Sequence, residues 1–143
     1  MFRSVLSVLA GIAVLTGASF AIEAAVNPML LHLFPQALPS REALGSNPWV
    51  RTLTFSYGFA CVAAGGYIAA SVARRLQFQH ATAMGIVQAC LTIWAMLSPI
   101  ANHASRWQWI TTAVLTIPAA MVGGAVYQGR KRDEELEKVS ASA

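Results

Sequence analysis

Charged residues are scarce in this sequence, and their scarcity excludes the commonest class of protein. Of its 143 residues only 11% are charged, whereas 56% are hydrophobic. A soluble domain usually carries about 25% charged residues. A globule of this length could not bury so much apolar sequence, because the apolar residues come in long runs. The composition therefore indicates a membrane protein.

Residues suited to catalysis or metal binding are also few. The two cysteines, Cys61 and Cys90, lie inside apolar runs and lack the spacing typical of metal or redox sites. No Ser/His/Asp set, phosphate loop or carboxylate pair can be assembled. His32, His103 and Glu23 carry groups that zinc accepts, but they lie on separate segments. We therefore predict no catalytic residue, no cofactor and no metal, and expect a protein that is not an enzyme.

The basic residues are placed at the ends of apolar runs. The net charge is +4, with ten Lys and Arg against six Asp and Glu. A nucleic-acid-binding protein would gather such residues on one face. Their position at the ends of hydrophobic segments is typical of membrane spans. The predicted partner is thus the lipid bilayer, and not nucleic acid.

Four apolar runs are each long enough to cross a bilayer. Residues 52–73 hold no charge and lie between Arg51 and Arg74-Arg75. At about 1.5 Å per residue this run covers about 33 Å, close to the thickness of a bilayer core. We predict an all-α fold, an antiparallel four-helix transmembrane bundle over residues 1–128 with a charged cytoplasmic tail over 129–143. The spans are residues 5–26, 52–73, 81–100 and 107–127.

Prolines mark the limits and irregularities of these spans. Asn27-Pro28 predicts the end of the first helix, because proline disfavours helix in the residue before it. A long outer loop, residues 27–50, then leads to the second helix. Pro118 predicts a bend in the fourth helix. The tail is expected to be solvated, with no more than a turn or two of helix.

The distribution of basic residues predicts the orientation. If both termini are cytoplasmic, three arginines lie outside, at 41, 51 and 106, and the other seven basic residues lie inside. This excess on the inner side favours cytoplasmic termini. An alternative left open is a cleaved signal peptide, with Ser19-Phe20-Ala21 as the cleavage site.

Small residues recur at helical spacing in every span. Such ridges let helices approach closely in lipid, where apolar side chains gain nothing by leaving hydrocarbon. The Gly-Gly and Tyr residues of the second span are echoed in the fourth, through either duplication of a hairpin or convergent packing. The predicted packing residues are Gly17, Ala21, Cys61, Gly65, Gly66, Ala69, Gly85, Gly123 and Gly124.

Four polar side chains near or inside the spans are candidate site residues. We expect Glu23 and Arg51 to form an ion pair that closes the first hairpin, because isolated charges at membrane depth are costly. The alternative is a cation or proton site at Glu23. Gln88 and Thr92 lie one turn apart and are expected to form interhelical hydrogen bonds. Their alternative is a path for a solute.

Several motifs resemble those of a family of small, uncharacterised bacterial four-helix integral membrane proteins. Gly65-Gly66-Tyr67 ends a helix, Arg74-Arg75 forms a basic turn, and His80-Ala81 opens the third helix. A Trp-led fourth helix carries Pro-x4-Gly-Gly, here from Pro118 to Gly123-Gly124. Glu23 and Arg51 occupy positions where that family commonly has an acidic residue and an arginine. The resemblance covers about residues 5 to 130. It implies the fold and a bacterial inner membrane, but no activity.

Two functions are compatible with this sequence. The abundance of small-residue ridges favours a scaffold or accessory subunit that binds its own copies or a larger membrane complex. The alternative is a small oligomeric transporter or channel that uses Glu23 and Gln88.

Overall fold

The structure is a computed structural model that describes residues 2–73, 75–98 and 106–141. Within these ranges every regular element is a helix: α1 (Phe2–Leu33), α2 (Arg41–Ser46), α3 (Pro48–Val72), α4 (Gln77–Leu97) and α5 (Arg106–Ala141). All but α2 are long and apolar enough to cross a membrane. The predictions of an all-helical chain and of four candidate spans are therefore confirmed.

The first helix is longer than the sequence predicts. Asn27-Pro28 does not end α1, which runs on to Leu33 with Pro28 inside it. Proline removes one backbone hydrogen bond and crowds the carbonyl four residues earlier. The next turn is nevertheless held in place, because Leu30 is buried in a cluster with Leu44 and Val50. Tertiary packing thus keeps the helix going past its proline.

A short helix, α2, fills part of the predicted long loop. Ser40 begins it by accepting a hydrogen bond from the Ala43 amide at 3.3 Å. Asn47 then caps α3, where its side-chain oxygen accepts from the Trp49 amide at 3.0 Å. Pro48 occupies the first turn of α3, where its missing N–H costs nothing. These caps make the chain re-enter the bundle immediately after α2.

The last helix differs most from expectation. The described part of the charged tail is exposed, as predicted, but it holds far more than a turn or two of helix, since α5 is continuous from Arg106 to Ala141. Its polar end has good helix formers, and Arg130 Nε lies 3.2 Å from Glu134 Oε1 one turn later. The α4 helix begins at Gln77 and ends at Leu97, so the predicted residues 99 and 100 of that span fall outside the described residues.

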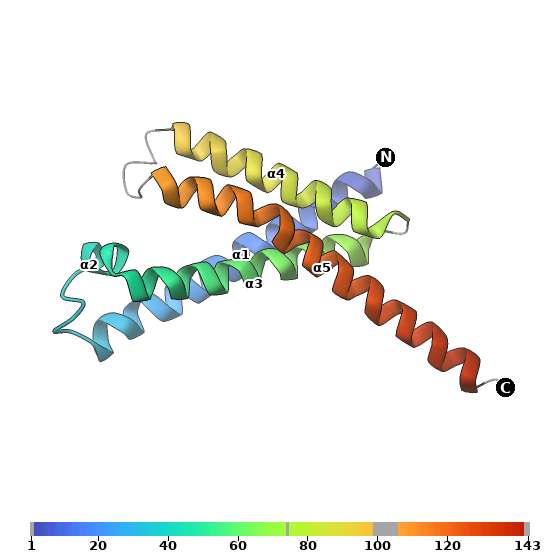
Figure 1. Ribbon diagram of the computed structural model, residues 1–143, viewed down its shortest axis with the longest axis horizontal. Helices are drawn as coiled ribbons and strands as arrows, with labels where there is room; N and C mark the ends of the chain where they lie inside the picture. The colour runs from blue at the N-terminus through green and yellow to red at the C-terminus, as the bar shows by residue number, and fades with distance from the viewer. Residues whose placement is uncertain (1, 74, 99–105, 142–143) are drawn as a thin grey trace.

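The four long helices form two arms that cross (Figure 1). One arm is made by α1 and α3, with α2 at its end, and the other by α4 and α5. The arms lie apart at the end where α2 sits, which we call the α2 end, and meet near the middle of α5. The rest of α5 projects beyond the opposite end, which we call the tail end, and the N-terminus lies at the tail end as well.

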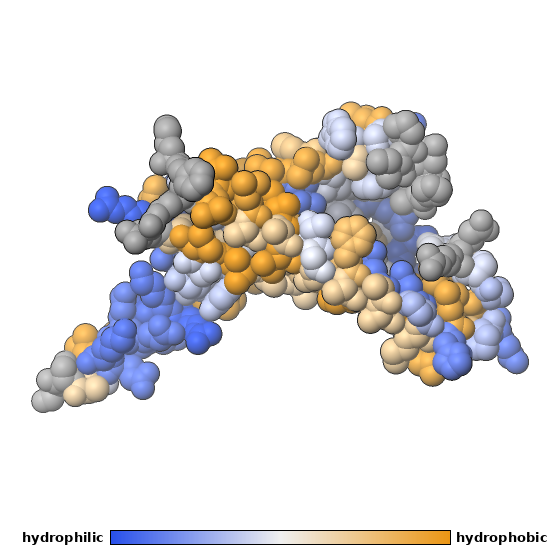
Figure 2. All heavy atoms as spheres, turned by 180° about the vertical axis from the view of Figure 1, so that it is seen from behind, coloured by the Kyte–Doolittle hydropathy of each residue, from blue (hydrophilic) through white to orange (hydrophobic). Residues whose placement is uncertain are grey.

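Small residues form the interior, and large apolar side chains face outward. Ala69, Ala81, Ala119 and Ala120 are fully buried, and Met84 is the largest side chain with almost no exposure. By contrast, Trp94 and Leu97 are more than half exposed. Figure 2 shows the resulting apolar band across the middle of the molecule, with hydrophilic surface on the projecting tail. This inversion is expected where lipid surrounds the protein.

Candidate functional site: a cleft between the two arms

Glycines bring the two arms into contact. A Cβ added to Gly66 would overlap the carbonyl of Ala120, and one added to Gly123 would overlap the carbonyl of Ala63. The backbones of α3 and α5 therefore touch directly. Beyond this crossing the rings of Tyr67 and Tyr127 pack edge to face, with centroids 5.3 Å apart. The similar motifs of the second and fourth spans are thus the two sides of one contact.

A second close approach joins α1, α3 and α4. A Cβ on Gly11 would lie 2.7 Å from the Gly65 carbonyl oxygen, and 3.1 Å from Met84 Cγ. Gly85 and Gly124 make comparable approaches between α4 and α5. Of the other predicted packing residues, Cys61 and Ala69 are buried. Gly17 and Ala21 are exposed, and no atom lies within 4 Å of a Cβ built on Gly17.

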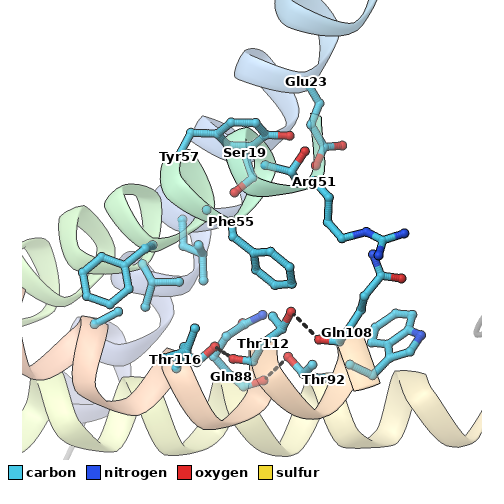
Figure 3. Close-up of a pocket in the computed structure, with 18 of the residues that line it drawn as sticks. Ser19, Glu23, Arg51, Phe55, Tyr57, Gln88, Thr92, Gln108, Thr112 and Thr116 are labelled. Carbon is cyan, nitrogen blue, oxygen red and sulfur yellow. Dashed lines mark hydrogen bonds between the residues drawn. The ribbon is translucent and has the colours of Figure 1, made fainter. Parts of the chain in front are cut away.

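A cleft of about 560 Å³ lies between the arms, on the α2 side of the glycine crossing. Figure 3 shows its two walls, one from α1 and α3 and the other from α4 and α5. Its volume is within the range of about 300–1,000 Å³ that is typical of ligand sites. Polar side chains from all four long helices line it: Ser19, Glu23, Arg51, Thr54, Tyr57, Gln88, Thr92, Gln108, Thr112 and Thr116.

The four predicted polar residues all line this cleft, but they do not make the ion pair and the interhelical hydrogen bonds that we expected. Glu23 and Arg51 lie at the same end of it (Figure 3). They do not form an ion pair; within the described ranges the one ion pair joins Arg130 to Glu134. The continuation of α1 to Leu33 explains the difference, because the chain does not turn back toward α3 directly after Glu23.

Arg51 instead bridges to α5 and to the end of α2. Its Nη2 donates to the Gly45 carbonyl at 3.2 Å, and its guanidinium lies 5.2 Å from the centroid of the Trp107 ring. Phe55 approaches the same ring, with centroids 6.2 Å apart. These contacts connect the two arms across the α2 end of the cleft. A cation over an aromatic face is stabilised by the ring quadrupole.

Two buried N–H groups at this end have no acceptor. Arg51 Nε and Trp109 Nε1 are both buried, and neither has a hydrogen-bond partner among the residues that the structure describes. A buried donor without a partner typically costs about 1–3 kcal/mol. An acceptor that entered the cleft and bonded to them would recover this free energy.

The threonines of the cleft are satisfied within their own helices. Thr92 donates to the Gln88 carbonyl at 2.9 Å, and Thr116 donates to the Thr112 carbonyl at 2.7 Å. Gln88 and Thr92 therefore do not form the interhelical hydrogen bonds that we expected. The side-chain amide of Gln88 faces the cleft with no partner in the described part of the chain.

Of the ten polar lining residues, four were predicted as site residues from the sequence. The others, together with Trp109, also border the cleft but were not predicted: Ser19, Thr54, Tyr57, Gln108, Thr112 and Thr116. A signal was present in the spacing. Gln108, Thr112 and Thr116 recur every four residues along α5, and Ser19 precedes Glu23 by four residues on α1. Polar residues at that spacing share one face of a helix.

Comparison with known proteins identifies no relative of this chain: no family model matches it, and no curated protein or solved structure is significantly similar to it. The described residues also contain no group of three or more His, Cys, Asp or Glu side chains placed to hold a metal ion. His103, one of the zinc ligands considered above, lies outside those residues. The cleft is therefore interpreted from its own geometry.

Proposed function

We propose that this protein is a non-enzymatic, multi-pass protein of the bacterial inner membrane that binds a small molecule in the cleft between its arms. It would act as the solute-binding unit of a small transporter or channel. The observation that carries the proposal is the cleft itself, which gathers Glu23 from α1, Arg51 from α3, and Gln88 and Thr92 from α4. These are the residues whose polarity is hardest to explain by packing alone.

The proposed topology is an antiparallel four-helix bundle with both termini in the cytoplasm. Arg75 and the basic residues 130–132 belong to the tail end, and Arg51 and Arg106 to the α2 end. The larger number of basic residues at the tail end supports its placement on the cytoplasmic side. The cleft then opens in the outer half of the membrane, and the resemblance of the glycine motifs to a bacterial family supports the inner membrane.

The scaffold function was predicted from the small-residue ridges, and most of these ridges are already used within the chain. Gly65, Gly66, Gly85, Gly123 and Gly124 all make close contacts within the chain, so those ridges are not free for a partner. Among the predicted packing residues, which all lie in the described part of the chain, Gly17 and Ala21 on α1 are the two that remain uncovered. The face of α1 that carries them supports self-association as a second candidate function.

Filling the cleft should remove a bound molecule without harming the fold. Gly58 lines the cleft, and no atom lies within 4 Å of a Cβ built there. Gly58→Leu should therefore fit, and leucine favours helix over glycine. We expect a small molecule that co-purifies with wild-type protein from native membranes to fall at least about tenfold in this variant, equivalent to about 1.4 kcal/mol. Mass spectrometry of extracts from the purified proteins measures the change.

Gly17→Leu is the matched control, because the same substitution is made at an open helical position outside the cleft. Equal amounts of every co-purifying species in wild type and both variants would contradict the proposal. The control also tests the second candidate. If α1 mediates self-association, Gly17→Leu should lower the dimer fraction in native mass spectrometry from mild detergent, whereas Gly58→Leu should not.

A further inference from the structure

The length of the cleft matches half a bilayer. On α3 its lining runs from Arg51 to Val62, and on α5 from Gln108 to Ala119. Each stretch rises about 16 Å at about 1.5 Å per residue. One leaflet of hydrocarbon is about 15 Å thick, half of a core of about 30 Å. Both walls thus extend from the end of a span to the middle of the membrane.

The chemistry of the lining changes along this length. Both charged residues, Glu23 and Arg51, are at the α2 end (Figure 3). Trp109, in the first turn of α5, adds an N–H that has no partner among the described residues. The other end is closed by Leu15, Val62 and Ala119. Between them, the threonine hydroxyls donate to carbonyls of their own helices and require no acceptor from a ligand. The cleft therefore has a charged end and a largely apolar channel.

The two charges at the α2 end are opposite in sign and not paired with each other. Arg51 and Trp109 offer donors to an anionic group, and a guanidinium bonds phosphate oxygens in a favourable geometry. Glu23 offers acceptors to a protonated amine. A group that carries both charges would satisfy both residues at once.

The cleft is also open to the side. Phe59 and Leu115 belong to its lining, yet they are 39% and 41% exposed. In a bilayer, side chains so placed contact lipid. A molecule could therefore enter the cleft from the membrane without crossing the polar α2 end.

We infer that the cleft binds a zwitterionic amphiphile from the outer leaflet, with a phosphate at Arg51 and Trp109, an amine at Glu23 and an acyl chain along α3 and α5. This inference rests on the proposed function and names the ligand class of the same site. Any second acyl chain of the lipid stays in the bilayer, past Phe59 and Leu115. The phosphate accepts from Arg51 Nε and Trp109 Nε1, the two buried donors that have no partner within residues 2–73, 75–98 and 106–141.

The test compares three probes on the full chain in a non-ionic detergent, with binding measured by native mass spectrometry. The probes are a single-chain phosphoethanolamine lipid, a monoacylglycerol of equal chain length, and glycerophosphoethanolamine, which has the head group but no chain. We expect the zwitterionic lipid to bind at least about tenfold more tightly than either of the others, since each lacks one half of the recognised molecule.

Three variants locate this binding. Arg51→Gln is expected to weaken it at least about tenfold, whereas Arg75→Gln, an exposed arginine at the tail end, should leave it unchanged. Gly58→Leu fills the channel without altering a charge and should weaken binding as well, so the result does not depend on one variant folding well. A fourth probe, a single-chain phosphoglycerol lipid of equal chain length, keeps the phosphate but lacks the amine. Glu23→Gln should remove the preference of the protein for the phosphoethanolamine lipid over this phosphoglycerol lipid.

The outcomes separate this inference from the proposed function. If glycerophosphoethanolamine binds as tightly as the lipid, and Gly58→Leu abolishes that binding, the ligand is not an amphiphile. The proposal of a solute site in the cleft would then stand. Monoacylglycerol binding as tightly as the zwitterionic lipid, or a preference for ethanolamine that survives Glu23→Gln, would overturn the zwitterionic head group. Lipid binding that is unchanged in both Arg51→Gln and Gly58→Leu would overturn the inference altogether. The co-purification experiment decides the proposed function independently.

Discussion

Replacing Gly123 with alanine is expected to force α5 away from α3. Among substitutions of glycine by alanine, each of which adds one methyl group, this one should lower the stability of the protein most. The added Cβ would overlap the Ala63 carbonyl and lie 2.8 Å from the Tyr67 amide nitrogen. Both neighbours are backbone, so neither can move without a shift of the whole helix. Overpacking typically costs about 1–3 kcal/mol and occasionally more. We expect a value near the top of that range, about 3 kcal/mol, for the free energy of unfolding.

Gly129→Ala is the control for this substitution. Gly129 lies in the same helix, and no atom is within 4 Å of a Cβ built there. Alanine should stabilise this exposed position by up to about 1 kcal/mol through its higher helix propensity. Unfolding of both variants in a detergent titration, followed by far-ultraviolet circular dichroism, measures the difference. If both alanines shift the midpoint equally, the glycine crossing does not hold the arms together.

Met84→Ala should be the second most damaging change. Met84 is fully buried, and its Cγ and Cε fill the space beside Gly11 and Gly65. Truncation leaves a cavity where α1, α3 and α4 meet. Such substitutions cost about 2–5 kcal/mol in water-soluble proteins. In lipid the side chain is not transferred to water on unfolding, so only the lost packing counts, and we expect about 2 kcal/mol.

The same substitution at Met29 provides the comparison. Met29 is 60% exposed near the end of α1, so its truncation should change the free energy of unfolding by less than about 0.5 kcal/mol. The detergent titration applies here too. A loss at Met84 no greater than that at Met29 would show that the junction of α1, α3 and α4 contributes little to stability.

The existence of the long helices could be predicted from the sequence, but several of their limits could not. Hydropathy alone identifies four segments long enough to span a bilayer. Local signals predicted an end to the first helix at Pro28, yet the burial of Leu30 against Leu44 and Val50 outweighs them. The tail likewise gave no hydrophobic signal, and its helix follows from continuity with the span before it.

Four residues of the candidate site could be predicted from the sequence, but the cleft that they line could not. Glu23, Arg51, Gln88 and Thr92 stood out because polar groups are rare in such segments, and all four line the cleft. Their relation to one another depends on how far the arms separate. That separation is set by the glycine contacts at the middle of the molecule, which fix where helices touch and leave the α2 end apart. Spacing along one helix carries no information about the distance between two.

The glycine crossing, where Gly66 meets Ala120 and Gly123 meets Ala63, also has a consequence for the way the protein is made. The two glycines are separated by 57 positions, from 66 to 123, in the chain. At a synthesis rate of roughly 5–20 residues per second, the ribosome needs about 3–11 s to pass from one to the other. Throughout that interval the residues of α5 that will cover the glycines of α3 are still being translated. The backbone contact at the glycine crossing is therefore among the last that the nascent chain can form.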